Sequence, residues 1–410
     1  MEIKVVAIGA AGGKAAVELI EEGIVTENRV ILINSTLKDV PDDYKHLAIQ
    51  LSGGKGCGKE RELSKTLCLN SIRDNTLEKL DSLVDPTDEL VIVVSSTAGG
   101  TGSGSTPIIA KYFKEAIGVP VQCFAFTGFE EDGRELQNTI EYFQEMEDVF
   151  TVQAISNKKF LDGGSNNKIK AEKLANKEFA KRVGILIGKG MIDSEQNIDE
   201  SDLFKISTTP GYMDISSVDL SNIKNIDQFN KALTLMLDED KALETNEKGM
   251  LRLGVFLNIP EKMYDFVDYN FTILKERLGN PYEVFSHIQY NEDLPIGLSF
   301  ISSGMKMPID EVKEIYKKYK EESDKVNKSK DNFFDFASGL RGNQEDSMFN
   351  SATNRRSASK SKADFLNGMS FGTVKESNNA VENNTVKSNN HNDKKEVKKL
   401  NKEEFVKNNF

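Results

Sequence analysis

Short runs of apolar residues alternate along the chain with segments in which apolar residues recur every three or four positions. The runs are residues 3–8, 30–33, 90–94, 119–126 and 149–155. A nearly continuous apolar run is typical of a strand that is covered on both faces, and the segments between the runs are long enough for helices. The pattern predicts a doubly wound parallel α/β sheet over residues 1–170.

A second part of the chain follows a long helical pattern at residues 169–187. An acidic segment, Gly211–Asp219, comes after it and is expected to be a loop. From residue 251 the order strand, helix, strand, strand predicts a smaller α/β domain, closed by a charged helix at 308–326. The expected boundaries are 171–215 for the core helix with the acidic loop and 216–326 for the C-terminal domain.

The last part, residues 327–410, has a different composition. Residues 351–410 hold 12 Lys plus Arg against 7 Asp plus Glu, a net charge of +5, and are rich in Asn and Ser. So few branched apolar residues bury too little surface to offset the entropy of ordering. A disordered basic tail is therefore expected over 327–410.

The whole chain of 410 residues carries a net charge of −12, which argues against a protein that coats nucleic acid along its length. Its three cysteines, Cys57, Cys68 and Cys123, have neither metal-ligand nor disulfide spacing, which suits a reducing compartment. The longest apolar run is too short to span a bilayer, and the first residues lack a signal-peptide layout. A soluble cytoplasmic protein without a membrane partner is expected.

Three glycine-rich segments follow predicted strands, at the sheet edge where open α/β folds bind ligands. Residues 9–13 look like a dinucleotide fingerprint, but Asn34 stands where the ribose-binding acid belongs. Residues 53–59 fit the first part of a P-loop, but Glu60 replaces the hydroxyl that would bind magnesium. Neither motif is complete.

Residues 99–104, Gly-Gly-Thr-Gly-Ser-Gly, give the strongest signal. Four glycines in six residues are conformationally costly, but they let backbone N–H groups approach an anion closely. Thr101 and Ser103 add hydroxyl donors, and a helix is expected from about Pro107 with its positive end toward the same ligand. The segment predicts a phosphate site.

The segment Ala98–Gly104 resembles the glycine loop of the tubulin and FtsZ superfamily of polymerising GTPases, and the resemblance extends over residues 1–326. Because of its tail the chain resembles most the TubZ-like branch of plasmids and bacteriophages. The resemblance implies GTP or GDP with Mg²⁺ as cofactors, and filament formation. It also implies a set of nucleotide-binding residues: Gly9, Ala10, Ala11, Gly12, Gly13, Lys14, Asn34, Gly53, Gly54, Lys55, Gly56, Gly99, Gly100, Thr101, Gly102, Ser103, Gly104, Glu130, Arg134, Asn157 and Asn176.

The chain departs from the family pattern at three places. Glu131 replaces a glycine in the Phe-Glu-Gly-x-x-Arg pattern, and Glu172 stands where an aromatic residue often stacks on guanine. The acidic loop of the family reads Gly-x-x-Asn-x-Asp-x-x-Asp. Matched to Gly211, it leaves Asp214 and Asp219 but has Ser216 in place of the middle acid.

The two acids of that loop are the expected catalytic residues. A helix of about 20 residues is about 30 Å long, so acids beyond its far end cannot reach the nucleotide of their own molecule. They reach a neighbour's nucleotide if subunits stack head to tail, and such stacking builds an open filament. Asp214 and Asp219 are therefore expected to position water at the GTP of the next subunit.

The basic tail has two interpretations. It is either a solubilising spacer or a tether whose last residues, including Lys398, Lys399, Phe405 and Phe410, engage DNA through a centromere-binding adaptor. The leading hypothesis is thus a filament-forming GTPase that moves plasmid or phage DNA. Its alternatives are an FtsZ-like division protein, a doubly wound NAD- or ATP-dependent enzyme, and a structural member of the superfamily that does not hydrolyse GTP.

Overall fold

The computed structural model describes residues 2–84, 88–165, 167–194, 196–239, 249–341 and 401–409. The chain divides into two compact units, Met1–Asp324 together with Lys398–Phe410, and Lys325–Val397. The described elements belong to the first unit, except for the end of the helix Ile309–Arg341, which lies in the second.

The first unit contains one ten-stranded sheet in its described residues, with the strand order β3-β2-β1-β4-β5-β6-β7-β10-β8-β9. The elements up to residue 165 are β1 (Ile3–Ile8), α1 (Gly9–Glu21), η1 (Glu27–Arg29), β2 (Val30–Asn34), η2 (Leu37–Asp39), η3 (Asp42–Leu47), β3 (Ala48–Gln50), α2 (Arg61–Arg73), α3 (Lys79–Leu83), β4 (Leu90–Ser96), α4 (Gly100–Lys111), η4 (Tyr112–Ile117), β5 (Val121–Thr127), α5 (Gly133–Met146), β6 (Thr151–Ser156), α6 (Asn157–Phe160) and η5 (Leu161–Ser165).

The remaining elements are α7 (Lys168–Leu186), α8 (Glu200–Ser207), β7 (Gly211–Asp219), α9 (Ile226–Glu239), β8 (Arg252–Asn258), η6 (Glu261–Phe266), α10 (Thr272–Leu278), β9 (Glu283–Gln289), β10 (Gly297–Met305), α11 (Ile309–Arg341) and α13 (Lys402–Asn409). None of the described helices is both long enough and apolar enough to cross a membrane.

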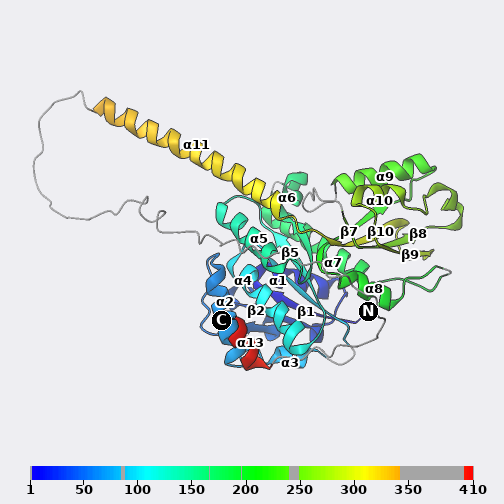
Figure 1. Cartoon of the computed structure of the whole chain (residues 1–410), viewed down its shortest axis with the longest axis horizontal. Helices are drawn as coiled ribbons and strands as arrows, with labels where there is room; N and C mark the ends of the chain where they lie inside the picture. The colour runs from blue at the N-terminus through cyan, green and yellow to red at the C-terminus, as the bar shows by residue number, and fades with distance from the viewer. Residues whose placement is uncertain are drawn as a thin grey trace, which may run out of the picture. The chain divides into compact units, whose positions relative to one another are not determined.

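Strands β1 to β7 pair in parallel with their neighbours, and β10 pairs antiparallel with both β7 and β8. Alternate residues of β1 explain why both faces are covered. Val5 and Ala7 pack in one cluster with α1 and α7, whereas Val6 and Ile8 pack in the other with α2, α4 and α5. Figure 1 shows α7 between the N-terminal strands of the sheet and its C-terminal strands. The predicted doubly wound fold with a second α/β part is confirmed.

Two elements of the first unit differ from the sequence prediction. Helix α4 begins at Gly100 and not near Pro107, so most of the glycine segment is helical. Gly211–Asp219 is not a loop but strand β7, in which Tyr212, Asp214 and Ser216 alternate with Met213 and Ile215. Paired to β6 on one side and β10 on the other, this strand gains ladder hydrogen bonds that a loop would lack.

The tail also differs from the prediction at both of its ends. Helix α11 continues past Val326 to Arg341, and a short helix, α13, forms at Lys402–Asn409 and packs against the first unit. The predicted residues between them, 342–397, lie outside the described part of the chain, as do Lys398, Lys399 and Phe410.

Candidate nucleotide site

A cavity of about 400 Å³ lies at the carboxyl ends of β1, β2 and β4, where three of the glycine-rich segments meet. Its volume is within the range of small-molecule sites. The lining residues are Ile8, Gly9, Ala10, Ala11, Lys14, Asn34, Ser35, Thr36, Asp39, Gly56, Cys57, Gly58, Ser96, Gly99, Gly100, Thr101, Gly102, Phe126, Asn157, Glu172 and Asn176.

Two helices point their N-termini into this cavity. The first turn of α1 contributes Gly9, Ala10 and Ala11, and the start of α4 contributes residues 99–102. Neither helix has a side-chain cap or an acidic residue in its first turn. The unsatisfied N–H groups and the positive dipole ends therefore favour an anion between the two helices.

Close backbone packing explains the glycines better than loop flexibility does. Gly9 has φ +77°, and a Cβ there would lie 3.2 Å from the Gly102 nitrogen. A Cβ on Gly102 would lie 2.9 Å from the Ser96 carbonyl oxygen, and one on Gly104 would lie 2.4 Å from the Arg61 carbonyl oxygen. The glycines let α4 lie directly against β4 and α2, which holds its N-terminus at the cavity.

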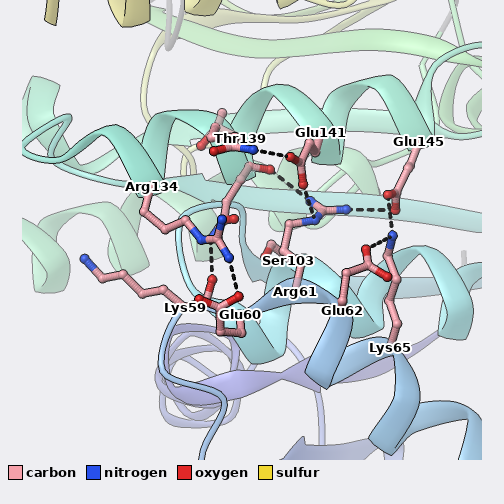
Figure 2. Close-up of polar contacts among 12 residues, drawn as sticks. Lys59, Glu60, Arg61, Glu62, Lys65, Ser103, Arg134, Thr139, Glu141 and Glu145 are labelled. Atoms are coloured by element: carbon pink, nitrogen blue, oxygen red, sulfur yellow. Dashed lines mark hydrogen bonds and ion pairs between the residues drawn. The ribbon is translucent and has the colours of Figure 1, made fainter. Parts of the chain in front are cut away.

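The third glycine segment reaches the cavity only through Gly56, Cys57 and Gly58. The Lys59 ammonium is turned away, because it bonds the Asp132 carboxylate at 2.5 Å and the Glu135 carboxylate at 2.8 Å. Arg134 forms an ion pair with Glu60 (Figure 2). These two cations therefore brace the segment against α5 and leave the cavity to backbone donors.

Amide side chains line the rest of the cavity and have unused hydrogen-bonding atoms. The Asn34 Nδ2 and Asn157 Oδ1 atoms are buried, and neither has a hydrogen-bond partner among the described residues. Leaving a buried polar atom unpaired costs about 1–3 kcal/mol, so both atoms favour a polar ligand at this place. Asn176, on α7, lines the same cavity.

One ion pair spans the wall of the cavity. Lys14 on α1 and Glu172 on α7 are 2.8 Å apart, and both side chains are partly exposed. Lys14 is the one basic residue among those that line the cavity. Glu172 stands where the family pattern often has an aromatic residue. It lies on the cavity wall with Asn176, and its ion pair connects α7 to α1.

The structure brings twelve of the predicted nucleotide-binding residues to the cavity: Gly9, Ala10, Ala11, Lys14, Asn34, Gly56, Gly99, Gly100, Thr101, Gly102, Asn157 and Asn176. It does not place the other nine there: Gly12, Gly13, Gly53, Gly54, Lys55, Ser103, Gly104, Glu130 and Arg134. Ser103, for example, donates its hydroxyl to the Gly99 carbonyl within α4, and Glu130 pairs with Lys158 at 2.7 Å.

Nine further lining residues are not among the predicted nucleotide-binding residues: Ile8, Ser35, Thr36, Asp39, Cys57, Gly58, Ser96, Phe126 and Glu172. Several of them carry a simple signal. Ile8 and Ser96 are the last residues of parallel strands, and Ser35 and Thr36 directly follow β2. The last residues of each strand could therefore have been included on topology alone.

The two predicted catalytic acids are not in a loop. Asp214 is buried within β7, where its carboxylate lies 3.4 Å from the Arg182 guanidinium and accepts a hydrogen bond from the Ser216 hydroxyl at 3.1 Å. Burial would lower the pKa of Arg182, but the nearby Asp214 and Glu178 carboxylates raise it. This burial and pairing do not support the prediction that Asp214 faces a neighbour's nucleotide.

Asp219 ends the same strand and is exposed. Its carboxylate accepts hydrogen bonds from the Ser221 hydroxyl at 2.5 Å and from the Ser221 N–H at 2.8 Å, which lowers its pKa. It lines a second, larger and mostly apolar cavity of about 580 Å³ between α7 and the C-terminal strands. Neither Asp214 nor Asp219 lines the nucleotide cavity.

A better match to the family's acidic pattern lies earlier in the chain. Asn197-Ile-Asp199-Glu-Ser-Asp202 fits Asn-x-Asp-x-x-Asp completely, including the middle acid. This segment follows α7 and opens α8, with Asp199 as the N-cap that accepts a hydrogen bond from the Asp202 N–H at 2.8 Å. Asp199 is exposed and Asp202 half-buried.

Comparison with known proteins adds to this geometry. Residues 2–164 match the Tubulin/FtsZ family, GTPase domain. The tubulin-like protein CetZ1 of Haloferax volcanii is 28% identical over 216 residues, which cover 49% of this chain and 54% of that protein. The tubulin-like protein TubZ of Clostridium botulinum C phage is 30% identical over 210 residues, covering 49% and 55%. The chain spans about half the length of these curated relatives.

Solved structures of the same group share the fold. The crystal structure of Clostridium botulinum phage c-st TubZ has a TM-score of 0.61 at 20% identity and covers 78% of this chain and 98% of that one. A GTPγS-form protofilament of TubZ from Bacillus thuringiensis serovar israelensis has a TM-score of 0.64 at 16% identity, covering 81% and 94%. Residues 2–164, which contribute most of the cavity at the sheet edge, thus match a GTPase domain of the Tubulin/FtsZ family.

Proposed function

We propose that the chain binds GTP in the cavity and hydrolyses it when copies of the chain stack head to tail. The observation that carries this proposal is the convergence of two uncapped helix N-termini on one cavity within the matched GTPase domain. Backbone donors there suit a chain of phosphates better than any other common ligand.

Each part of the nucleotide has a matching part of the wall. In the proposed complex the phosphates would lie between Gly9–Ala11 and Gly99–Gly102, and the base would lie toward Asn176 on α7, because these residues line the cavity. The described residues contain no group of three acids, histidines or cysteines that could hold a metal alone. A Mg²⁺ ion would therefore enter with the nucleotide, held mainly by phosphate oxygens as in other nucleotide sites.

The water-positioning acids of the proposal are Asp199 and Asp202, in place of Asp214 and Asp219. Helix α7 rises about 15 Å between Asn176 and its end, so acids beyond that end cannot touch a γ-phosphate in the same cavity. A neighbour stacked on this end brings the two together, and such stacking repeats into an open filament. Positioning water and stabilising charge are what phosphoryl transfer requires from the protein.

The biological part of the proposal concerns the tail. A net charge of +5 in residues 351–410, on a body of opposite charge, favours engagement of DNA or of a DNA-bound adaptor. Filaments that carry such a tail suit the movement of plasmid or phage DNA.

Phosphate release and light scattering, measured against protein concentration with GTP, test the proposal. Activity per molecule should be close to zero at low concentration and should rise above a threshold that coincides with scattering. ATP should give neither signal. A constant activity per molecule without scattering would overturn the filament part, and equal use of ATP would overturn the guanine part.

Single variants test the assignment of the acids. Asp202→Ala and Asp199→Ala should still bind GTP and assemble but should release phosphate at least a hundredfold more slowly. Asp219→Ala is the matched control, because it removes an exposed acid from the site first predicted. Loss of activity in Asp219→Ala, with normal activity in the other two, would return the catalytic role to Asp219.

A further inference from the structure

The last helix of the chain, α13, packs against two elements of the GTPase domain. Its neighbours are α2 and η4, which lie more than 280 residues earlier in the sequence. Figure 1 shows α13, in red, beside the blue helix α2 near the marked C-terminus. These elements and α13 belong to the same compact unit.

The contact has an apolar centre and a charged edge. Phe405 and Val406 are buried, and the ring of Phe405 meets the Tyr112 ring edge-on at 5.3 Å between centroids. At the edge, the Lys402 ammonium lies 2.5 Å from the Asp81 carboxylate on α3. The Tyr112 hydroxyl donates to the other oxygen of that carboxylate at 2.5 Å, so one acid joins both parts of the contact.

The helix has its own N-terminal signal. The Asn401 side chain accepts a hydrogen bond from the Glu404 N–H at 2.8 Å, and the Glu404 carboxylate accepts one from the Asn401 N–H at 3.4 Å. This reciprocal pair is a capping box. Even so, a helix of eight residues is marginal in water by itself, so its formation depends on the docking of Phe405 and Val406.

We propose that the surface formed by α2, α3 and η4 is a binding site for the C-terminal helix of the same chain, and that docking withholds this helix from outside partners. Phe405 and Val406 are the apolar residues of the described segment 401–409, so a partner that binds this segment needs them. Both are buried against the GTPase domain. The two interactions therefore exclude each other.

The site also defines the chemistry of a competing partner. Such a partner would offer an apolar, aromatic-lined groove for Phe405 and Val406 and a carboxylate for Lys402, as Tyr112 and Asp81 do here. This inference does not depend on GTP binding, and its tests are made without nucleotide.

Amide hydrogen exchange on the full chain tests the docking. The amides of residues 404–409 should be protected in the wild type, and Phe405→Ala should reduce that protection at least about tenfold, because truncating a buried Phe removes most of the contact. Lys407→Ala, at an exposed position, is the matched control and should keep the protection. Amides of α5 should be unchanged in all variants, which excludes global unfolding.

A charge reversal distinguishes specific docking of α13 from non-specific apolar association. Lys402→Glu should lower the protection a few-fold, since it places a like charge beside Asp81, and adding Asp81→Lys should restore it. Protection should not change with protein concentration. Protection that grows with concentration would show docking between copies, and unprotected α13 amides in the wild type would show no docking; either result overturns the proposal.

A labelled peptide of residues 401–410 tests the withholding. It should bind the Phe405→Ala chain, whose site is vacant, at least tenfold more tightly than the wild-type chain, whose site is filled. Equal binding to both chains, or binding to neither, would contradict an exchangeable site.

Discussion

Two adjacent glycines at the start of α1 should respond in opposite directions to the same substitution. A Cβ on Gly12 would lie 2.3 Å from the Val94 carbonyl oxygen, about 1 Å closer than the ordinary contact of 3.4–4 Å. A Cβ on Gly13 would meet no atom within 4 Å. Both residues are inside the helix, so both gain about 0.5–1 kcal/mol from the better helix propensity of alanine.

The difference between the two variants follows from packing. Overpacking a core costs about 1–3 kcal/mol, and the upper end applies to Gly12 because its nearest neighbours are backbone atoms that cannot rotate away. Gly12→Ala should therefore lower the free energy of unfolding by about 2 kcal/mol, and Gly13→Ala should raise it by about 0.5–1 kcal/mol. In a unit of this size these changes correspond to roughly −4 °C and +1 to +2 °C in Tm.

Thermal unfolding followed by circular dichroism without nucleotide measures both shifts. Nucleotide binding offers a second measurement, since moving α1 by about 1 Å displaces Gly9–Ala11 from the cavity wall, and Gly12→Ala should then bind GTP more weakly. Equal Tm shifts for the two variants would refute the packing of α1 against β4 on which the geometry of the site depends.

Three further predictions follow from single contacts. Asp214→Ala should lower the free energy of unfolding by about 3 kcal/mol in urea titrations, because Arg182 stays buried and keeps only Glu178 as a carboxylate partner among the described residues; wild-type stability would contradict the ion pair. Asp132→Ala should cost about 1 kcal/mol at pH 7 through loss of the α5 N-cap. Burial would raise the pKa of Asp132, but hydrogen bonds from Lys59 and the Glu135 N–H lower it, so the contribution is present above about pH 4 and should fade as the pH drops through the lowered pKa; a cost independent of pH between 2 and 7 would argue against it. Asn157→Ala should weaken GTP binding about tenfold without lowering the Tm of the nucleotide-free protein, since its Oδ1 has no hydrogen bond to lose; an equal loss of stability would assign it a structural role.

The position of the candidate site was predictable because it depends on topology. Apolar runs followed by glycines place Gly9, Asn34 and Gly99 at the carboxyl ends of neighbouring parallel strands, and the structure brings all three to one cavity. What the sequence did not reveal is which glycines face the ligand. Gly102 and Gly104 look alike in the sequence, but Gly104 is needed for contact with Arg61 on α2.

The acidic pattern was matched to Gly211 because the family pattern begins with a glycine. Ser194 stands where the family pattern has Gly, so Asn197–Asp202 was passed over and Gly211 was taken as the anchor. The alternation of Tyr212, Asp214 and Ser216 with Met213 and Ile215 was the available sign of a strand. The partner of Asp214, Arg182 on α7, is 32 residues away, and no local pattern reports such a pair.

The docked C-terminal helix was missed because composition was averaged over the whole tail. Its capping box, Asn401 with Glu404, is a local signal that the surrounding Lys and Asn residues obscured. The contact of Phe405 with Tyr112 joins residues 293 positions apart, so it depends entirely on the tertiary fold.

The central claim is that one copy supplies the cavity and another supplies the acids, and a mixing experiment tests it most directly. Gly99→Tyr should block the cavity without disturbing the fold, because a Cβ there meets no atom within 4 Å, and it keeps Asp199 and Asp202. Asp202→Ala keeps the cavity and loses an acid. Each variant alone should be inactive, and an equal mixture should recover up to about a quarter of wild-type GTP hydrolysis, the share of interfaces that pair an intact cavity with intact acids in a randomly mixed filament. A mixture as inactive as its two components, under conditions where both copolymerise, would contradict the claim.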